Sequence, residues 1–168
     1  MKAREIELPV AHYFSVFRNL VVANVSHGFA PLALWEMDLA VVSKSGYLYE
    51  VEIKTSKADL LCDLKKDRWN SLKIMRFHEI VSQYFIAMPE KLFTSLSEED
   101  LKKLHDFSGI LTVKDDGTNY YTGRVKCIRP STKKRGRKLS DNEMYQLARL
   151  GAIRYWTRHE HKPKLEDA

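Results

Sequence analysis

Three charged side chains, Asp38, Glu52 and Lys54, have the types and the spacing needed to hold a cation and act on a phosphate. The tetrapeptide Ser43-Lys44-Ser45-Gly46 separates two apolar, β-branched segments and predicts a tight turn between two strands. Asp38 and Glu52 each lie seven residues from Ser45. A symmetric hairpin therefore makes them cross-strand neighbours, roughly 5 Å apart at Cβ.

Two carboxylates at that separation repel each other unless a cation lies between them, and hard oxygen ligands suit Mg²⁺ or Mn²⁺. Lys54 lies two residues beyond Glu52 and so on the same face of the strand, whereas Val51 and Ile53 point to the opposite face. Hydrolysis of a phosphodiester needs an activated water and neutralisation of the phosphate charge. A metal supplies both, and the ammonium of Lys54 can hold the hydroxide or an oxygen of the transition state.

The acid-x-Lys triplet is a weak signal by itself, because it also occurs at 63–65, 100–102 and 160–162. Only the triplet at 52–54 lies in an alternating, strand-like segment with a second acid at the same depth across a turn. The alternative is a solvated strand face with a salt bridge such as Glu36 to Lys54. A shift of the hairpin register by one residue would also separate the three groups.

These residues resemble the core of the PD-(D/E)xK nuclease superfamily and, more narrowly, the MmcB-like DNA-repair family. The likeness covers roughly residues 34 to 156. It is carried by Trp35-Glu36-Met37-Asp38, by Tyr49-Glu50-Val51-Glu52-Ile53-Lys54-Thr55-Ser56, by Asp59, Asp63 and Lys65, by Tyr84-Phe85-Ile86-Ala87-Met88-Pro89, by Gly109-Ile110-Leu111 and by the segment from Leu147 to Leu150.

The resemblance implies an α/β domain with a restriction-endonuclease-like mixed β-sheet flanked by α-helices. It implies a divalent metal held by Asp38, Glu52 and the carbonyl of Ile53, with Lys54 as the catalytic cation. Met37 replaces the proline that names the motif, and that proline ligates nothing. The helical acid of some relatives has no evident counterpart, so the alternatives for an auxiliary acid include Glu36, Glu5, Glu7 and Asp63.

Other patterns predict the elements that must position these residues. Apolar spacing predicts a helix from Pro9 to Val25 and another from Ser56 to about His78. Ser97 and the S-x-x-E capping box at Ser140 predict two further helix starts, and the last helix is expected to turn Met144, Leu147, Ala148, Gly151 and Tyr155 toward the core. Strands are predicted at 32–42, 47–53, 81–88, 109–113 and 119–128, with Asp116-Gly117 as the last turn.

Basic residues gather between Arg129 and Lys138, in a segment with no apolar side chain before Leu139. A pliant loop of this kind can neutralise phosphates without reading bases. Asp59 and Asp63 are expected to border the site on the second helix, or else to form ion pairs on an exposed helix face. The residues predicted to contact nucleic acid are Lys65, Lys66, Lys133, Lys134, Arg135, Arg137 and Lys138.

The composition fits one packed domain. The chain has 168 residues, 44% of them apolar, a formal charge of +6 and a pI near 9.2. We expect a single nuclease-like domain over 1–158, a flexible tail over 159–168, and a soluble, cytoplasmic protein that contacts no membrane and can form a homodimer. Cys62 and Cys127 are read as free thiols, because neither belongs to a CxxC pair.

The resulting prediction is a nuclease that uses Mg²⁺ or Mn²⁺ to hydrolyse DNA in repair or processing. Two alternatives remain open at this stage. One is a non-catalytic DNA-binding or adaptor module with the same fold, and the other is an RNA-processing nuclease, because metal and lysine act on the phosphate and not on the sugar.

Overall fold

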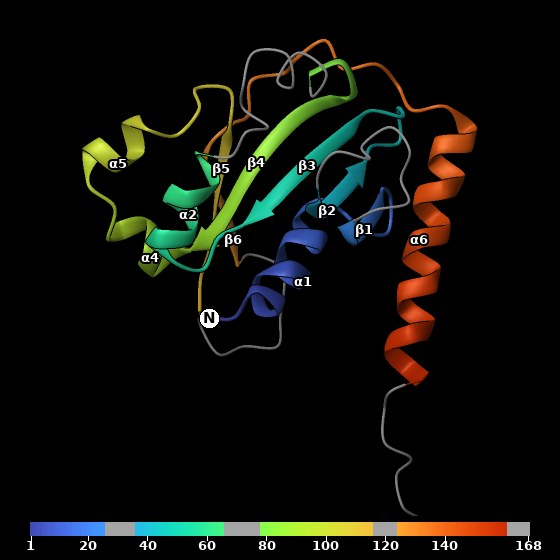
Figure 1. Ribbon diagram of the computed structural model, residues 1–168, viewed down its shortest axis with the longest axis horizontal. Helices are drawn as coiled ribbons and strands as arrows, with labels where there is room; N and C mark the ends of the chain where they lie inside the picture. Colours follow the sequence, from blue (N-terminus) through green and yellow to red (C-terminus); the bar gives the residue numbers. More distant parts are fainter. Residues whose placement is uncertain (26–35, 66–77, 116–123, 161–168) are drawn as a thin grey trace, which may run out of the picture.

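The computed structural model describes residues 1–25, 36–65, 78–115 and 124–160, and its centre is one mixed sheet of six strands (Figure 1). The strands lie in the order β1-β2-β3-β4-β5-β6, which is also their order in the chain. Strands β3, β4 and β5 are parallel, and every other neighbouring pair is antiparallel. Their bounds are Leu20–Val25, Met37–Val42, Leu48–Ile53, Val81–Pro89, Gly109–Val113 and Val125–Arg129.

Helices cover both faces of this sheet. Helix α1 contacts β2 to β6, whereas the longest helix, α6, runs beside β1 (Figure 1). The helices α1, α2, α4, α5 and α6 span Ala3–Tyr13, Lys57–Asp63, Glu90–Thr94, Glu98–Lys102 and Asp141–Glu160. An α/β architecture with a mixed sheet flanked by helices, as predicted, is therefore present.

Side chains alternate between the two faces and build two apolar clusters. On one face, Ile6 and Val10 of α1 pack with strand residues such as Val51 and Leu111. On the other face, Leu60 of α2 and Leu147 of α6 belong to a larger cluster that includes residues of β1 to β5. The candidate acids on β3 lie on this second face, because Glu50 and Glu52 alternate with Val51 and Ile53 of the first cluster.

The predicted hairpin between β2 and β3 is confirmed. Leu39 pairs with Val51 and Val42 with Leu48 in an antiparallel register. Gly46 in the turn has a φ of 86°, a left-handed conformation that glycine adopts without strain. Continuing the register by one residue places Asp38 opposite Glu52, as the symmetric count from Ser45 predicts.

The predicted helix from Pro9 to Val25 is wrong. Helix α1 begins at Ala3, where the backbone N–H of Lys2 donates to the Glu5 carboxylate at 2.6 Å, and Pro9 lies in its interior rather than its first turn. Residues 20–25 form strand β1 instead, paired with β2. The spacing of Val21 and Val25 fits a helix as well as a strand. The strand forms because β-branched side chains pack well on a pleated sheet and because β2 offers backbone groups with which residues 20–25 can pair.

Most of the remaining predicted elements agree with the structure where it describes them. The strands at 81–88 and 109–113 are β4 and β5, and the last helix begins with Ser140 in the predicted capping box with Glu143. Leu147 is fully buried, but Tyr155 is 57% exposed and is not a core residue. Residues 32–35, residues 66–77 and the turn at 116–117 lie outside the described residues.

Two end points differ from their predictions. The helix that begins after Ser56 is described as α2, which ends at Asp63. His159 and Glu160 belong to α6, so the part of the predicted tail that the structure describes is helical, and 161–168 lie outside it. Among the described residues, no helix combines the length and the apolar character that crossing a membrane requires.

Candidate functional site

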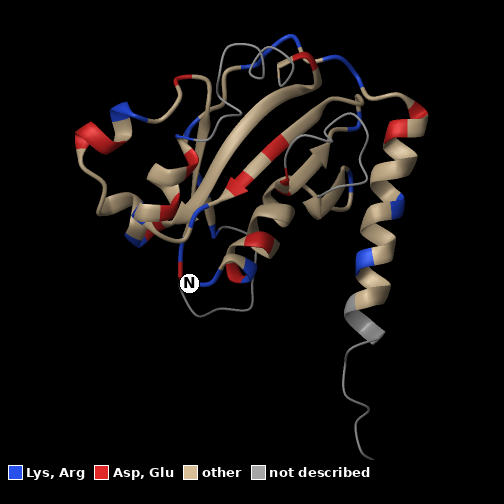
Figure 2. Ribbon diagram, in the orientation of Figure 1, with Lys and Arg blue, Asp and Glu red and all other residues tan. Residues whose placement is uncertain are grey.

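Strand β3 carries three charged side chains into the interior on one face. Glu50, Glu52 and Lys54 alternate along the strand and are 0%, 4% and 3% exposed. Figure 2 shows the two acidic positions along β3. Charges are removed from water only at a large cost in free energy unless they are paired, so this row needs partners from other elements.

Lys54 is the cation around which the acids are arranged. Its Nζ lies 3.1 Å from Glu52 Oε2, 3.3 Å from Asp63 Oδ1 and 3.8 Å from Asp59 Oδ1. Burial lowers the pKa of Lys54, but the attraction of Glu52 and Asp63, the hydrogen bond to Glu52 and the attraction of Asp59 outweigh burial and raise it above its ordinary value. The side chain is therefore a fixed ammonium at neutral pH, suited to donating hydrogen bonds and not to acting as a base.

Asp38 reaches the same end of β3 from the neighbouring strand. Its Oδ2 accepts a hydrogen bond of 2.7 Å from the backbone N–H of Ile53. The pairing of β2 with β3 ends at Leu39 and Val51, so the carboxylate takes the place of a main-chain acceptor at that end. This bond fixes Asp38 relative to Glu52 and Lys54, the residues on either side of Ile53.

Helix α2 brings the remaining acids to Lys54. The helix starts at Ser56, whose Oγ accepts a hydrogen bond from the Asp59 N–H at 3.2 Å. Leu60 is buried in the larger core cluster and anchors the helix on the sheet. One turn of spacing then places Asp59 and Asp63 on the side that faces Lys54, and Asp63 is 2% exposed and lies 3.5 Å from the Tyr84 hydroxyl.

The donor set fits a hydrated Mg²⁺ better than a metal held entirely by protein. Among the described residues, no three His, Cys, Asp or Glu side chains are grouped so that they could hold a metal ion. Asp38 and Glu52 supply two carboxylates, and Mg²⁺ commonly binds one or two carboxylates while keeping several waters or substrate oxygens. The predicted ligands Asp38, Glu52 and the Ile53 carbonyl are oxygen donors of the type that this ion prefers.

The alternative prediction of a solvated strand face is wrong, because the three β3 residues are buried and Lys54 pairs with Glu52, Asp63 and Asp59. Glu36, the partner expected in that alternative, is exposed just before β2. Glu50 was not singled out from the sequence. The signal that could have found it is its position two residues before Glu52, which puts it on the same face.

The basic segment lies at the opposite end of β3 from this site (Figure 2). Tyr47 forms an isolated antiparallel bridge with Lys138, seven residues before Lys54 on the same strand. At about 3.3 Å per residue, the two ends are separated by roughly 23 Å. Lys133, Lys134, Arg135, Arg137 and Lys138 therefore do not line the acidic cluster.

The segment is also not a pliant loop, contrary to the prediction. Its backbone N–H groups at Lys134 and Arg137 donate to the carbonyls of Ser82 and Glu79, each at 2.8 Å. Gly136 is buried so closely against β4 that an added Cβ would lie 2.7 Å from the Ser82 nitrogen. The backbone is therefore pinned along the start of β4, and the charges are presented from a fixed support.

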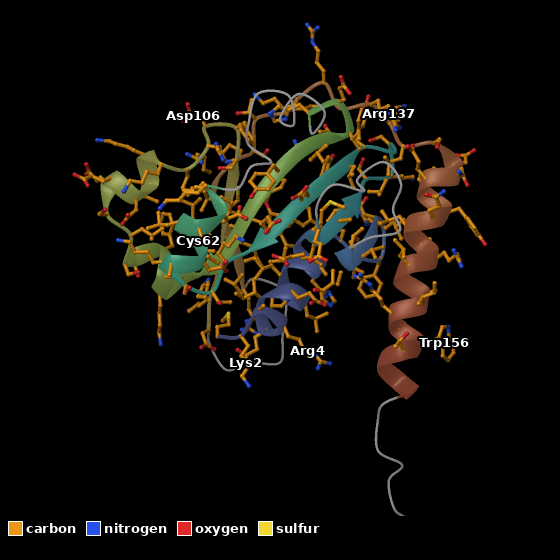
Figure 3. The ribbon with its side chains drawn as sticks, viewed as in Figure 1. Lys2, Arg4, Cys62, Asp106, Arg137 and Trp156 are labelled. Atoms are coloured by element: carbon orange, nitrogen blue, oxygen red, sulfur yellow. The ribbon has the colours of Figure 1, made fainter. Side chains whose placement is uncertain are left out.

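Its side chains differ in how far they are engaged within the protein. Arg137 makes a bidentate pair with Glu143 of α6, at 2.7 Å and 2.5 Å, beside the start of the helix (Figure 3). The Nζ atoms of Lys133 and Lys138 lie 5.3 Å and 5.8 Å from the centre of the Tyr47 ring. Arg137 thus has a structural role, while the exposed lysines keep their charge at the surface.

Lys65 lies two residues after the end of α2, and its side chain is exposed. Lys66 lies outside the described residues. Cys62 on α2 and Cys127 on β6 form no disulfide, as predicted, and the structure shows both to be exposed (Figure 3 labels Cys62).

Comparison with known proteins supports the fold of this chain and gives no information on its activity. No model of a known family matches the chain, and no curated protein does. One solved structure, described as the SPO1766 protein of unknown function from Silicibacter pomeroyi, superposes with a TM-score of 0.56. It is 18% identical and the alignment covers 99% of each chain, so the likeness extends over the whole α/β arrangement.

Proposed function

We propose that this protein is a divalent-metal-dependent nuclease of restriction-endonuclease-like fold that hydrolyses DNA phosphodiester bonds at Asp38, Glu52 and Lys54. One observation carries the proposal: the end of the β2–β3 hairpin brings two carboxylates and a buried ammonium together, with the Asp38 carboxylate tied to the backbone between the other two. A mixed sheet flanked by helices supports the fold assignment at the coarser level.

In this proposal Asp38, Glu52 and the Ile53 carbonyl hold Mg²⁺ or Mn²⁺. The ion, when bound, activates water and neutralises charge on the phosphate. The chain's own contribution is orientation. The Ile53 N–H holds one oxygen of Asp38 in place, and the Lys54 ammonium holds one oxygen of Glu52.

Lys54 serves as a hydrogen-bond donor to the attacking hydroxide or to an oxygen of the phosphate. Its raised pKa keeps it charged, so it stabilises negative charge and accepts no proton. Asp63 and Asp59 of α2 act as positioning residues, because they hold the ammonium from the side opposite β3. Among the auxiliary acids considered from the sequence, Asp63 fits better than Glu36, because Asp63 contacts Lys54 and Glu36 is exposed.

The separation between the site and the basic segment sets the size of the substrate. A DNA strand advances about 3.4 Å per nucleotide, so a distance of roughly 23 Å corresponds to about seven nucleotides. A substrate that reaches from Lys54 to Lys133 and Lys138 must therefore extend at least that far from the scissile bond. A DNA substrate that extends less far from the scissile bond is cut without contacting the basic segment.

A non-catalytic DNA-binding module remains the second candidate, and one observation favours it. Within the described residues the acids near Lys54 are already neutralised in part by the ammonium, and no group of three metal-ligating side chains is present. Such a cluster can stabilise a fold without turnover. The two candidates differ in whether bound DNA is cut.

A cleavage assay separates them. Labelled duplex, single-stranded and branched DNA and matched RNA are incubated with the protein and Mg²⁺, Mn²⁺ or a chelator. The nuclease proposal expects metal-dependent products from at least one DNA substrate and their loss in Asp38→Asn. Binding of DNA with no product under any metal condition rejects the nuclease and supports the adaptor, whereas products from RNA alone reassign the substrate.

A further inference from the structure

Among the described residues β1 is an edge strand of the sheet, with α6 running beside it (Figure 1). Its outer edge borders a groove of about 750 Å³ that residues of β1, α6 and α1 line. Four consecutive residues, from Leu20 to Ala23, line this groove. Side chains of a strand alternate between its two faces, so four consecutive lining residues mean that the backbone edge itself borders the groove.

One contact identifies which backbone groups point outward. The Arg154 guanidinium of α6 donates to the carbonyl oxygen of Ala23. Because residues two apart on a strand point their backbone groups to the same side, those of Val21 also point away from β2. The N–H groups of Val21 and Ala23 are thus directed into the groove, while Leu20 and Val22 face their partners Val42 and Ala40.

Small side chains on α6 keep the groove open. Ala148, Gly151 and Ala152 line it on the helix side, and an added Cβ on Gly151 would lie 3.4 Å from Val22. The charged side chains among the described lining residues are Arg4 and Arg154, both positive. An exposed strand edge beside a helix, with a cationic rim, is the arrangement that binds an extended peptide by strand addition.

We propose that the β1–α6 groove is a binding site for an extended protein segment that pairs with β1 and places acidic side chains beside Arg4 and Arg154. The segment supplies main-chain acceptors to the N–H groups of Val21 and Ala23, and its acidic side chains give the charge complement. This inference is independent of the proposed nuclease activity, because the groove is lined by β1, α6 and α1 and not by the acidic cluster on β3.

The test uses three fluorescein-labelled probes on the full chain: a ten-residue peptide alternating valine with glutamate, the same peptide with lysine in place of glutamate, and a ten-nucleotide oligodeoxythymidine. We expect the glutamate peptide to bind saturably and the lysine peptide to bind at least roughly tenfold more weakly. Ala152→Trp should abolish binding by filling the groove, and Ala152→Ser should preserve it; Ala152 is exposed, so both variants should fold.

Amide hydrogen exchange supplies a readout that identifies the edge. The N–H groups of Val21 and Ala23 should exchange rapidly in the free protein and slow down severalfold on binding, while that of Val22 should change little. The proposal is overturned if neither peptide binds, if Ala152→Trp binds the glutamate peptide as tightly as Ala152→Ser does, or if protection appears elsewhere. Displacement of the peptide by the oligodeoxythymidine would reassign the groove to nucleic acid.

Discussion

The two ends of strand β3 treat charge in opposite ways. At the end of the strand, Glu52 and Lys54 are withdrawn from water and held by ion pairs and by α2. At its start, the basic segment keeps Lys133 and Lys138 at the surface, over the ring of Tyr47, on a backbone pinned to β4. Buried charges are fixed in geometry and suit chemistry, whereas surface charges suit attraction of a polyanion.

The largest expected effect comes from removing the buried cation. Lys54→Met leaves Glu52 and Asp63 buried without the ammonium, and removing one partner of a buried ion pair typically costs about 3–5 kcal/mol of stability. Urea unfolding measures the change. Lys133→Met is the matched control at the other end of β3, and we expect a change of less than about 0.5 kcal/mol. Equal effects of the two substitutions would contradict the contrast between the ends.

Gly136→Ala should release the basic segment from its support. The new Cβ would lie 2.7 Å from the Ser82 nitrogen and 2.8 Å from its Cα, so the segment must move away from β4. We expect a loss of about 1–3 kcal/mol and faster exchange of the Lys134 and Arg137 amides. At Gly46 the three atoms nearest to an added Cβ belong to the Lys138 side chain, at ordinary van der Waals distances. Gly46→Ala therefore tests the backbone strain of a positive φ rather than a steric clash. Unchanged exchange at Lys134 in Gly136→Ala would show that the segment is not pinned.

Neutralising Lys133, Lys134 and Arg135 together should weaken DNA binding without affecting the fold. Each lost phosphate contact flattens the slope of log K against log salt by up to about 0.9 on duplex DNA. Fluorescence anisotropy over a salt series gives the slope, with duplexes shorter and longer than about seven base pairs beyond the cut. If the wild type and the triple variant give the same slope with the long duplex, these three side chains make no phosphate contacts and serve only as solvated surface charges.

The smallest effect is expected at the Arg137–Glu143 pair. Hydrogen bonding from Arg137 lowers the pKa of Glu143 to about 2, against the opposing effect of burial. A carboxyl whose pKa is depressed in the folded state contributes stability that is present above its ordinary pKa near 4.5 and is lost as the pH falls toward 2. Because Arg137 is half exposed, we expect the pair to contribute less than about 1 kcal/mol to the free energy of unfolding.

Chemical unfolding of the wild type and of Glu143→Gln measures this dependence. The stability difference between them should be constant from pH 7 to 5 and should shrink between pH 4.5 and 2. If the stability difference between the two proteins grows as the pH falls, the Arg137–Glu143 pair does not stabilise the contact between the basic segment and α6.

The core of the site could be predicted from the sequence because it is local. The turn at Ser45 and the alternation along β3 are enough to place Asp38, Glu52 and Lys54 together. The network around Lys54 depends on how α2 docks, and no spacing rule gives that orientation. For this reason the sequence suggested Asp63 only as an auxiliary acid, and it gave no reason to expect that replacing Lys54 would destabilise the fold.

Two further features required the assembled sheet. Val21 and Val25 fit both helical and strand spacing, and pairing of β1 with β2 resolves the ambiguity. The basic residues of 133–138 were expected to serve the same substrate as Lys54, but their position depends on where the chain crosses the sheet after β6. The bridge between Tyr47 and Lys138 places them at the far end of β3.

The most direct test of the central claim is single-turnover cleavage by Asp38→Asn. The asparagine side-chain oxygen can still accept the Ile53 N–H, so the hairpin end keeps its bond while the anionic oxygen that binds metal is lost. Thermal melting and DNA affinity of this variant should stay close to those of the wild type. We predict that the Mg²⁺-dependent cleavage rate falls by roughly 10²- to 10³-fold. Cleavage by Asp38→Asn at the wild-type rate, or absence of any metal-dependent cleavage by the folded wild type, would contradict the account.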